Sequence, residues 1–258
     1  MKTVCKVLGC RAGSPINGVP ASGYLIKFPD GNILMDCGPG VMLSLTEEEV
    51  DKLMGVIITH QHADHVLDLM SMAYYLGFPN KRKPIPIYAP DSVFSMLNKF
   101  DEVFGIATLE MLKTPIGSAF SYKPVVPGEP FHIEKHRFQT LLMKHPVETM
   151  AVKSEELGLV YTADGAYTEM LSYFIRGSST LIAEATYPEK KHHDLEAHGH
   201  MTAEQCALLA ENANIQQLIV THLSDAQSGS ITMSIVKSFF DGIIILAYPG
   251  LEIYFNRS

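Results

Sequence analysis

A histidine-rich segment, Thr59–His65 (THQHADH), constrains this chain more than any other part of its sequence. It follows a short apolar run, Met54–Thr59, which is typical of a strand covered on both faces. After the segment, apolar residues recur at helical spacing, which predicts an amphipathic helix. These residues are Val66, Leu69, Met70 and Ala73. The segment therefore lies at the junction between a buried strand and a helix.

The residue types and their spacing in this segment predict a metal-binding turn. His60 and His62 are two residues apart, so both side chains can point to the same side at the end of a strand. Asp64 is predicted to be the N-cap of the helix, with His65 in its first turn. Neutral imidazole and carboxylate are ligands that suit Zn²⁺ and similar ions. The turn can therefore present two pairs of ligands to two adjacent points.

Three further candidate ligands share one context, since each is a polar residue just past a predicted apolar strand. They are His145 after Phe138–Met143, Asp164 after Gly158–Thr162, and His222 after Gln217–Val220. Together with the turn they give five histidines and two carboxylates, which suffice for two ions with open coordination positions. Asp36, at the end of another apolar strand, either orients a ligand histidine by accepting its second N–H or caps its own turn.

The rest of the chain indicates a single domain of mixed α and β structure, residues 1–258, with sheets covered by helices. Hairpins are predicted from Gly23 to Asp36 and from Met150 to Thr162. The stretch Leu76–Pro90 is predicted to be a surface loop, with a mobile lid over the site as the alternative. Helices are predicted at Pro90–Phe100, Thr168–Arg176 and Ile231–Phe240, and after a capping box at Thr202–Gln205.

The composition excludes several classes of protein. With 258 residues, 47% of them hydrophobic, and no long block of one charge, the chain is not disordered. No apolar run reaches ~18 residues, so no membrane-spanning helix is expected. Because the N-terminus reads into a strand and the four cysteines show no paired spacing, we expect a cytoplasmic protein with reduced thiols. The net charge of −8 and the single basic cluster, Lys81–Lys83, argue against a large RNA as partner.

In order along the chain, the segments MDCG, THQHADH, His145, YTAD and LIVTHLS resemble the metallo-β-lactamase-fold hydrolase superfamily. The resemblance implies an α/β (α+β) fold, a four-layer αββα sandwich with two central sheets, and a dinuclear metal site at one edge of the sheets. By position, one ion would be held by His60, His62 and His145, and the other by Asp64, His65 and His222, with Asp164 bridging them. Two divalent ions are implied, with zinc as the expected metal and manganese or iron as alternatives.

Finer features resemble one branch of that superfamily, the ribonuclease Z-like phosphodiesterases and the atypical cyclic-nucleotide phosphodiesterases. They are the segments SGYL (Ser22–Leu25), EAT (Glu184–Thr186) and GHMT (Gly199–Thr202). The resemblance makes His200 the extra histidine of this branch and Glu184 its supporting carboxylate. Two departures stand out. Many members have Gly-Asp-Thr where this chain has Ala163-Asp164-Gly165, and the long basic arm of many bacterial ribonucleases Z is replaced here by a predicted hairpin.

The implied function is hydrolysis of a small phosphodiester, such as a cyclic nucleotide or a short oligonucleotide. Two ions about 3.5–4 Å apart lower the pKa of a shared water, so that hydroxide attacks phosphorus. Asp64 and Asp164 would orient this hydroxide, and His200, held by Glu184, would donate a proton to the leaving group. The alternatives are a lactonase or glyoxalase II-type hydrolase, whose branch lacks the GHMT segment, and a non-catalytic or electron-transfer module. Ribonuclease Z relatives are often dimers, which implies a homodimer.

Overall fold

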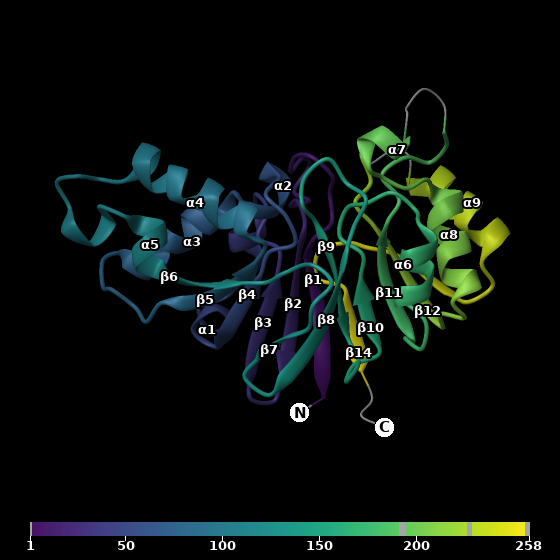
Figure 1. Ribbon diagram of the computed structural model, residues 1–258, viewed down its shortest axis with the longest axis horizontal. Coiled ribbons are helices and arrows are strands. Elements are labelled where there is room, and N and C mark those ends of the chain that lie inside the picture. The colour runs from purple at the N-terminus through teal and green to yellow at the C-terminus, as the bar shows by residue number, and fades with distance from the viewer. Residues whose placement is uncertain (1, 191–194, 226–228, 256–258) are drawn as a thin grey trace. The chain divides into compact units, whose positions relative to one another are not determined.

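The computed structural model describes residues 2–190, 195–225 and 229–255, and they form two compact units (Figure 1). Unit 1 comprises Met1–Gly9, Ser14–Val126 and Pro249–Ser258, and unit 2 comprises Cys10–Gly13 and Pro127–Tyr248. Each unit is built on one seven-stranded mixed sheet flanked by helices. The predicted α/β class with two central sheets is therefore confirmed, while the single domain over residues 1–258 stays a prediction.

The sheet of unit 1 has the strand order β14-β1-β2-β3-β4-β5-β6, antiparallel from β14 to β3 and parallel from β3 to β6. Its strands are β1 (Thr3–Gly9), β2 (Gly23–Phe28), β3 (Gly31–Met35), β4 (Leu53–Ile57), β5 (Ile85–Ala89), β6 (Phe120–Pro124) and β14 (Glu252–Phe255). The predicted β2–β3 hairpin is confirmed, and because Phe28 pairs with Gly31 its turn is Pro29-Asp30.

One expectation for unit 1 is wrong, because five residues of the predicted loop Leu76–Pro90 belong to the sheet. Residues Ile85–Ala89 form β5, which pairs in parallel with both β4 and β6. Ile85, Ile87 and Ala89 are buried in strict alternation, as a half-buried strand requires. Lys and Pro residues precede the strand, and Pro86 lies inside it. Because proline is uncommon inside a strand, these residues obscured the alternation in the sequence.

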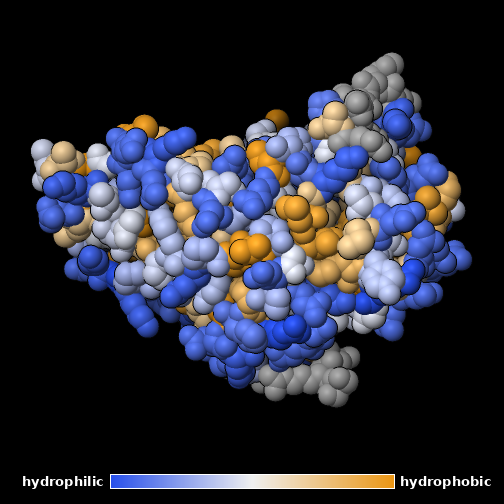
Figure 2. Space-filling view, viewed as in Figure 1, coloured by the Kyte–Doolittle hydropathy of each residue, from blue (hydrophilic) through white to orange (hydrophobic). Residues whose placement is uncertain are grey.

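The helices of unit 1 cover one face of its sheet, where α3, α4 and α5 lie in Figure 1. They are the 3₁₀ helices η1 (Val41–Ser44) and η2 (Glu110–Leu112) and the α-helices α1 (Glu47–Asp51), α2 (Ala63–Val66), α3 (Asp68–Gly77), α4 (Asp91–Phe104) and α5 (Pro115–Ala119). Helix α4 buries Val93, Phe94 and Leu97 and presents a largely hydrophilic outer surface (Figure 2). Its amphipathic pattern is the reason it packs on the sheet.

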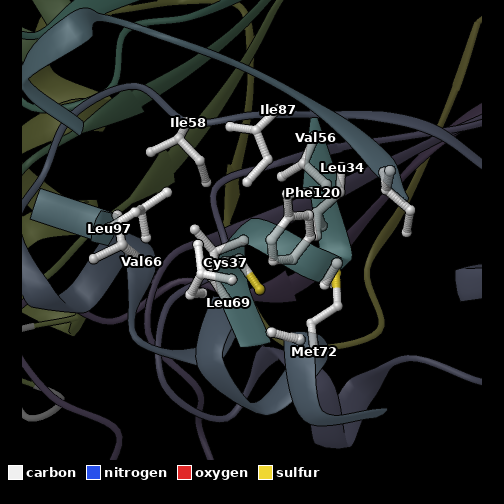
Figure 3. Packing of buried hydrophobic residues seen from close by; sticks show 14 of the residues in the cluster. Leu34, Cys37, Val56, Ile58, Val66, Leu69, Met72, Ile87, Leu97 and Phe120 are labelled. Atoms are coloured by element: carbon white, nitrogen blue, oxygen red, sulfur yellow. The ribbon is translucent and has the colours of Figure 1, made fainter. Parts of the chain in front are cut away.

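The core of unit 1 lies between its sheet and α3 (Figure 3). Leu69 and Met72 on α3 are fully buried and belong to the same cluster as Leu34, Val56 and Ile87 on the strands. Burying a side chain of this size contributes about 1.5–3 kcal/mol. The residues on both sides of the histidine-rich turn are thus anchored in one hydrophobic cluster.

Unit 2 has the strand order β13-β12-β11-β10-β9-β8-β7, parallel from β13 to β10 and antiparallel from β10 to β7. Its strands are β7 (Phe131–Ile133), β8 (His136–Leu142), β9 (Met150–Ser154), β10 (Leu159–Tyr161), β11 (Thr180–Glu184), β12 (Gln217–Thr221) and β13 (Ile243–Leu246). Its helices are α6 (Glu169–Phe174), α7 (Leu195–His198), α8 (Ala203–Asn212) and α9 (Gly229–Phe239). The predicted capping box at Thr202 opens α8.

Parallel strands place their carboxyl ends at the same edge of a sheet, and this decides where the polar residues of unit 2 lie. The segments that follow β10, β11 and β12 all begin at that edge. The segments after β10 and β12 carry Asp164 and His222, and Glu184 is the last residue of β11 at the same edge. Among the described residues, no helix combines the length and the apolar character needed to cross a membrane.

The four cysteines are free and buried, as the sequence predicts. Burial raises the pKa of the Cys5 thiol to about 12 and that of Cys10 to about 11, and it also raises the pKa of Cys37 and Cys206. Because the thiolate is the reactive form, we expect the native protein to react with none of its thiols at pH 8 and the urea-unfolded protein to react with all four. A titration with Ellman's reagent measures both states, and a fast-reacting native thiol would contradict this placement.

The burial of Leu69 in the core of unit 1 can be tested by substitution. Leu69→Ala should lower the free energy of unfolding by about 2–5 kcal/mol, because it removes a buried side chain and leaves a cavity. The matched control is Leu43→Ala, since Leu43 is 92% exposed and should change stability by no more than about 0.5 kcal/mol. Urea unfolding of both variants gives the comparison, and equal losses would show that Leu69 is not part of the core.

Candidate metal centre

The structure of unit 1 brings together the four candidate ligands of the histidine-rich turn, His60, His62, Asp64 and His65. The rings of His60 and His65 have centroids 4.1 Å apart, and those of His60 and His62 are 4.8 Å apart. Nε2 of His65 lies 3.7 Å from a carboxylate oxygen of Asp64. The turn begins at Thr59, two residues after Ile57, the last residue of β4, and it continues into α2. Three imidazoles and one carboxylate thus gather at the junction predicted from the sequence.

The predicted helix start is wrong by two residues. The N-cap of α2 is His62, whose backbone is extended at φ −66° and ψ 148°, and its side chain makes no capping hydrogen bond. Asp64 lies inside the first turn of α2. The sequence favoured Asp64 because aspartate is a common N-cap, but here α2 already begins at Ala63, directly after His62. As a result, the Asp64 carboxylate lies beside Nε2 of His65.

Asp36 orients this group, as predicted, and is fully buried. One of its carboxylate oxygens lies 2.7 Å from Nδ1 of His65, and the other accepts the backbone N–H of Thr59 at 2.9 Å. The Thr59 hydroxyl donates to the same carboxylate at 3.0 Å. Asp36 therefore joins the end of β3 to the segment after β4 and to α2.

The residues after Asp36 hold the turn by close backbone contact. The N–H of Cys37 donates to the carbonyl of His65 at 2.8 Å. A Cβ added at Gly38 would lie 1.9 Å from the carbonyl oxygen of Asp64, so only glycine allows this approach. The segment MDCG is thus a structural support for the histidine-rich turn.

In unit 2, the ends of the parallel strands bring a second group together. Nε2 of His222 lies 3.4 Å from a carboxylate oxygen of Asp164, and Nδ1 of His200 lies 3.0 Å from Oε1 of Glu184. Glu184, His200 and His222 have potential ligand atoms within 4.8 Å of one another. The ring of His145 has its centroid 5.2 Å from that of His200. All five residues that the sequence singles out in this unit are neighbours.

Glu184 is almost completely buried and accepts hydrogen bonds from several directions. Its donors include the backbone N–H groups of Gly165 at 2.8 Å and Met201 at 3.1 Å, and the Thr186 hydroxyl at 2.5 Å. The side chain of Met143 accounts for one departure from the family pattern. A Cβ at Gly165 would lie 2.4 Å from Cε and 3.1 Å from Cβ of Met143, so Met143 occupies the space that a threonine side chain would need.

His145 is oriented by the loop that carries the GHMT segment. Its Nδ1 lies 2.8 Å from the carbonyl oxygen of Gly199, which accepts the ring proton and leaves the Nε2 lone pair for a ligand. Gly199 has φ +65°, and a Cβ there would lie 2.7 Å from Cα of His145. Glycine is therefore required for two reasons, a backbone conformation and a close contact.

Several residues in or next to the two ligand groups have a strained backbone conformation. Asp36, Ala163 and His222 have positive φ values of 57°, 54° and 57°, although none is glycine. Each such residue costs about 1–3 kcal/mol and persists only where its surroundings hold it. Here the backbone N–H of Asp36 donates to the carbonyl oxygen of Ile57, and the backbone N–H of His222 donates to the carbonyl oxygen of Cys10. Asp36 and His222 are themselves candidate site residues, and Ala163 precedes the candidate ligand Asp164.

The donor set in each unit fits a divalent ion, because neutral imidazole nitrogens and carboxylate oxygens are the ligands that zinc, manganese and iron prefer. The family resemblance predicts that the candidate ligands of unit 1 and unit 2 hold one shared pair of ions, and this remains a prediction. Three supporting groups were missed in the sequence: the hydroxyls of Thr59 and Thr186 and the carbonyl of Gly199. Both threonines lie inside the motifs singled out from the sequence, but nothing in those motifs assigns them a partner.

Comparison with known proteins finds a metallo-hydrolase and a ribonuclease Z among the relatives of this chain. The chain is 27% identical over 251 residues to the probable metallo-hydrolase YhfI of Bacillus subtilis, covering 95% of this chain and 96% of that protein. It is 24% identical over 274 residues to a ribonuclease Z of Shouchella clausii, covering 84% and 85% of the two chains. The crystal structure of the metallo-β-lactamase fold protein YhfI superposes with a TM-score of 0.82 at 24% identity, over 98% of this chain and all of that one.

A crystal structure of a diphosphatase from the PhnP family has a TM-score of 0.76 at 18% identity, over 99% of both chains, which shows a shared fold. The family model of the β-lactamase superfamily domain matches residues 31–223, most of the chain. The chain therefore belongs to the β-lactamase superfamily, with the metallo-β-lactamase fold and the His/Asp clusters of a metallo-hydrolase.

The contact between Gly199 and His145 can be tested by substitution. Gly177→Ala is a matched control, since Gly177 has φ +77° with nothing within 4 Å of the added Cβ, and it should cost only about 1–2 kcal/mol of backbone strain. Gly199→Ala adds a clash with His145 to the same strain, so it should lower the free energy of unfolding further and displace the His145 resonances. Urea unfolding and NMR measure the two effects, and equal losses in both variants would refute the contact.

Proposed function

We propose that this chain is a metal-dependent phosphodiesterase that hydrolyses a small phosphodiester, such as a cyclic nucleotide or a short oligonucleotide. The observation that carries the proposal is the Glu184–His200 pair, which lies beside the candidate ligand His222. This pair supplies a histidine that is held by a carboxylate and is not needed to complete the predicted ligand set. A ribonuclease Z among the relatives supports phosphodiester chemistry.

The proposed ligand assignment follows the family resemblance. His60, His62 and His145 would hold one ion, and Asp64, His65 and His222 the other, with Asp164 bridging. The family match supports a joint role, since residues 31–223 include members of both ligand groups. Two divalent ions, zinc first and manganese or iron as alternatives, would lower the pKa of a water and neutralise charge on the phosphoryl oxygens.

The chain's own residues would orient the reactants and move the proton. The Nδ1–H of His200 donates to Glu184 at 3.0 Å, so Nε2 is the atom from which a proton can pass to the leaving alkoxide. Glu184 stabilises the positive charge of the doubly protonated ring before that transfer. Asp64 and Asp164 would accept hydrogen bonds from the attacking water and so orient it. We further propose a homodimer acting in the cytoplasm on a small substrate rather than on a large RNA.

Metal content tests the ligand assignment directly. Protein purified without chelators should contain about two divalent ions per chain, and Asp164→Ala should lower that number because the bridging carboxylate is lost. The matched control is His132→Ala, since His132 is an exposed histidine on β7 outside both groups. Elemental analysis gives the ratio. An unchanged content in Asp164→Ala, or a loss in His132→Ala, would contradict the assignment.

The role of His200 is tested by varying the leaving group. His200→Ala should lower kcat on a cyclic nucleotide by about 10²–10⁴, because an alkoxide needs a proton, and much less on bis-p-nitrophenyl phosphate, whose leaving group does not. Turnover of a lactone and a thioester is measured in parallel. Equal losses on both phosphodiesters would remove His200 from proton donation, and turnover of only the lactone or thioester would overturn the phosphodiesterase proposal.

A further inference from the structure

Two sets of side chains in this protein have the same hydrogen-bond arrangement. In unit 1, the Thr59 hydroxyl lies 3.0 Å from both carboxylate oxygens of Asp36 and 3.0 Å from Nδ1 of His60. The same carboxylate lies 2.7 Å from Nδ1 of His65. All four residues are fully buried. One carboxylate and one hydroxyl thus contact the Nδ1 atoms of two histidines.

In unit 2, Glu184 and Thr186 have the corresponding positions. The Thr186 hydroxyl lies 2.5 Å from Oε2 of Glu184 and 2.9 Å from Nδ1 of His222. Oε1 of Glu184 lies 3.0 Å from Nδ1 of His200. Glu184, Thr186 and His222 are each at least 95% buried. The arrangement therefore occurs once in each unit, with a different carboxylate residue, and in unit 2 the hydroxyl also lies 3.3 Å from Nδ1 of His200.

The number of protons decides the direction of each hydrogen bond. A threonine hydroxyl has one proton and two lone pairs, whereas a carboxylate oxygen can only accept. The hydroxyl proton must therefore go to Asp36 or Glu184, since the reverse would place two lone pairs face to face. The hydroxyl oxygen then has only lone pairs to offer the histidine, so Nδ1 of the ring must carry the proton.

We propose that Thr59 and Thr186 are positioning residues that select the ring tautomer of His60 and His222, keeping the proton on Nδ1 and the lone pair on Nε2. Asp36 and Glu184 select the same tautomer in His65 and His200 directly. The role of Nε2 as the atom that binds metal rests on the proposed function. The assignment of the tautomers rests only on the hydrogen bonds and is independent of that function. Free imidazole exchanges its proton between both nitrogens, so without these partners each ring would divide its population between two tautomers.

The first test uses the wild-type protein without metal. Long-range ¹H–¹⁵N NMR spectra of the histidine-labelled protein at pH 8 distinguish protonated from unprotonated ring nitrogens, and single histidine substitutions assign the signals. We expect the Nδ1–H tautomer for His60 and His222. An Nε2–H tautomer at either ring overturns the proposal for that unit without any threonine variant.

The second test removes the hydroxyls. Thr59→Val and Thr186→Val keep the side-chain shape, so they should shift the tautomer of the neighbouring ring and weaken zinc binding by about 10–100-fold in chelator competition. Thr59→Ser and Thr186→Ser keep the hydroxyl and should restore both values. Wild-type tautomers and affinity in the valine variants would overturn the proposal.

Each unit offers a matched control. Thr3 and Thr232 are 2% and 0% exposed, and in the described part of the chain their hydroxyls have no hydrogen-bond partner. Thr3→Val and Thr232→Val should therefore leave ring tautomers and zinc affinity unchanged, and a loss equal to that of Thr59→Val or Thr186→Val would assign the effect to general destabilisation. If the tautomers are as expected but no phosphodiester is hydrolysed, the proposed function fails and this inference stands.

Discussion

The local architecture of both ligand groups depends on satisfying a buried carboxylate. A carboxylate removed from water must be surrounded by hydrogen-bond donors, or its burial costs several kcal/mol. Asp36 obtains its donors from Thr59 and His65, and Glu184 obtains them from Gly165, Met201 and His200. These donors come from segments far apart in the sequence. The need to solvate one charge therefore holds several loops in place, and the candidate ligands lie on those loops.

The parallel half of each sheet explains why such segments meet. In unit 1, β3 and β4 run in parallel with Met35 opposite Ile57, so Asp36 and the turn after β4 begin at the same edge. In unit 2, β11 is parallel to β10 and β12, and Asp164, Glu184 and His222 follow or end these strands. Loops at the carboxyl ends of parallel strands collect functional residues in many open sheets. The antiparallel strands of each sheet extend its hydrophobic face and carry few of the candidate residues.

Much of this could be predicted from the sequence, because the signals were local. The β2–β3 hairpin, the Thr202 capping box and the strand before the histidine-rich turn depend on turn chemistry and periodicity within a few residues. The errors and omissions concern features that depend on tertiary contacts. Strand β5 was hidden by prolines, and the roles of Thr59 and Thr186 depend on partners 23 and 36 residues away. The motif around Thr59 contains the ring of His60 but not the carboxylate of Asp36, and the motif around Thr186 contains the carboxylate of Glu184 but not the ring of His222.

Strained backbone and buried hydrogen bonds together indicate that each ligand group, within its own unit, is organised before any ion binds. Asp36 and His222 have positive φ, and both belong to the carboxylate–threonine sets. Strain of about 1–3 kcal/mol at each residue is retained only if the surrounding contacts offset it. Those contacts are made by the chain itself: backbone N–H groups, hydroxyls and ring nitrogens. Because rotamer and tautomer are set within each unit in this way, little reordering of these rings is left for ion binding to drive.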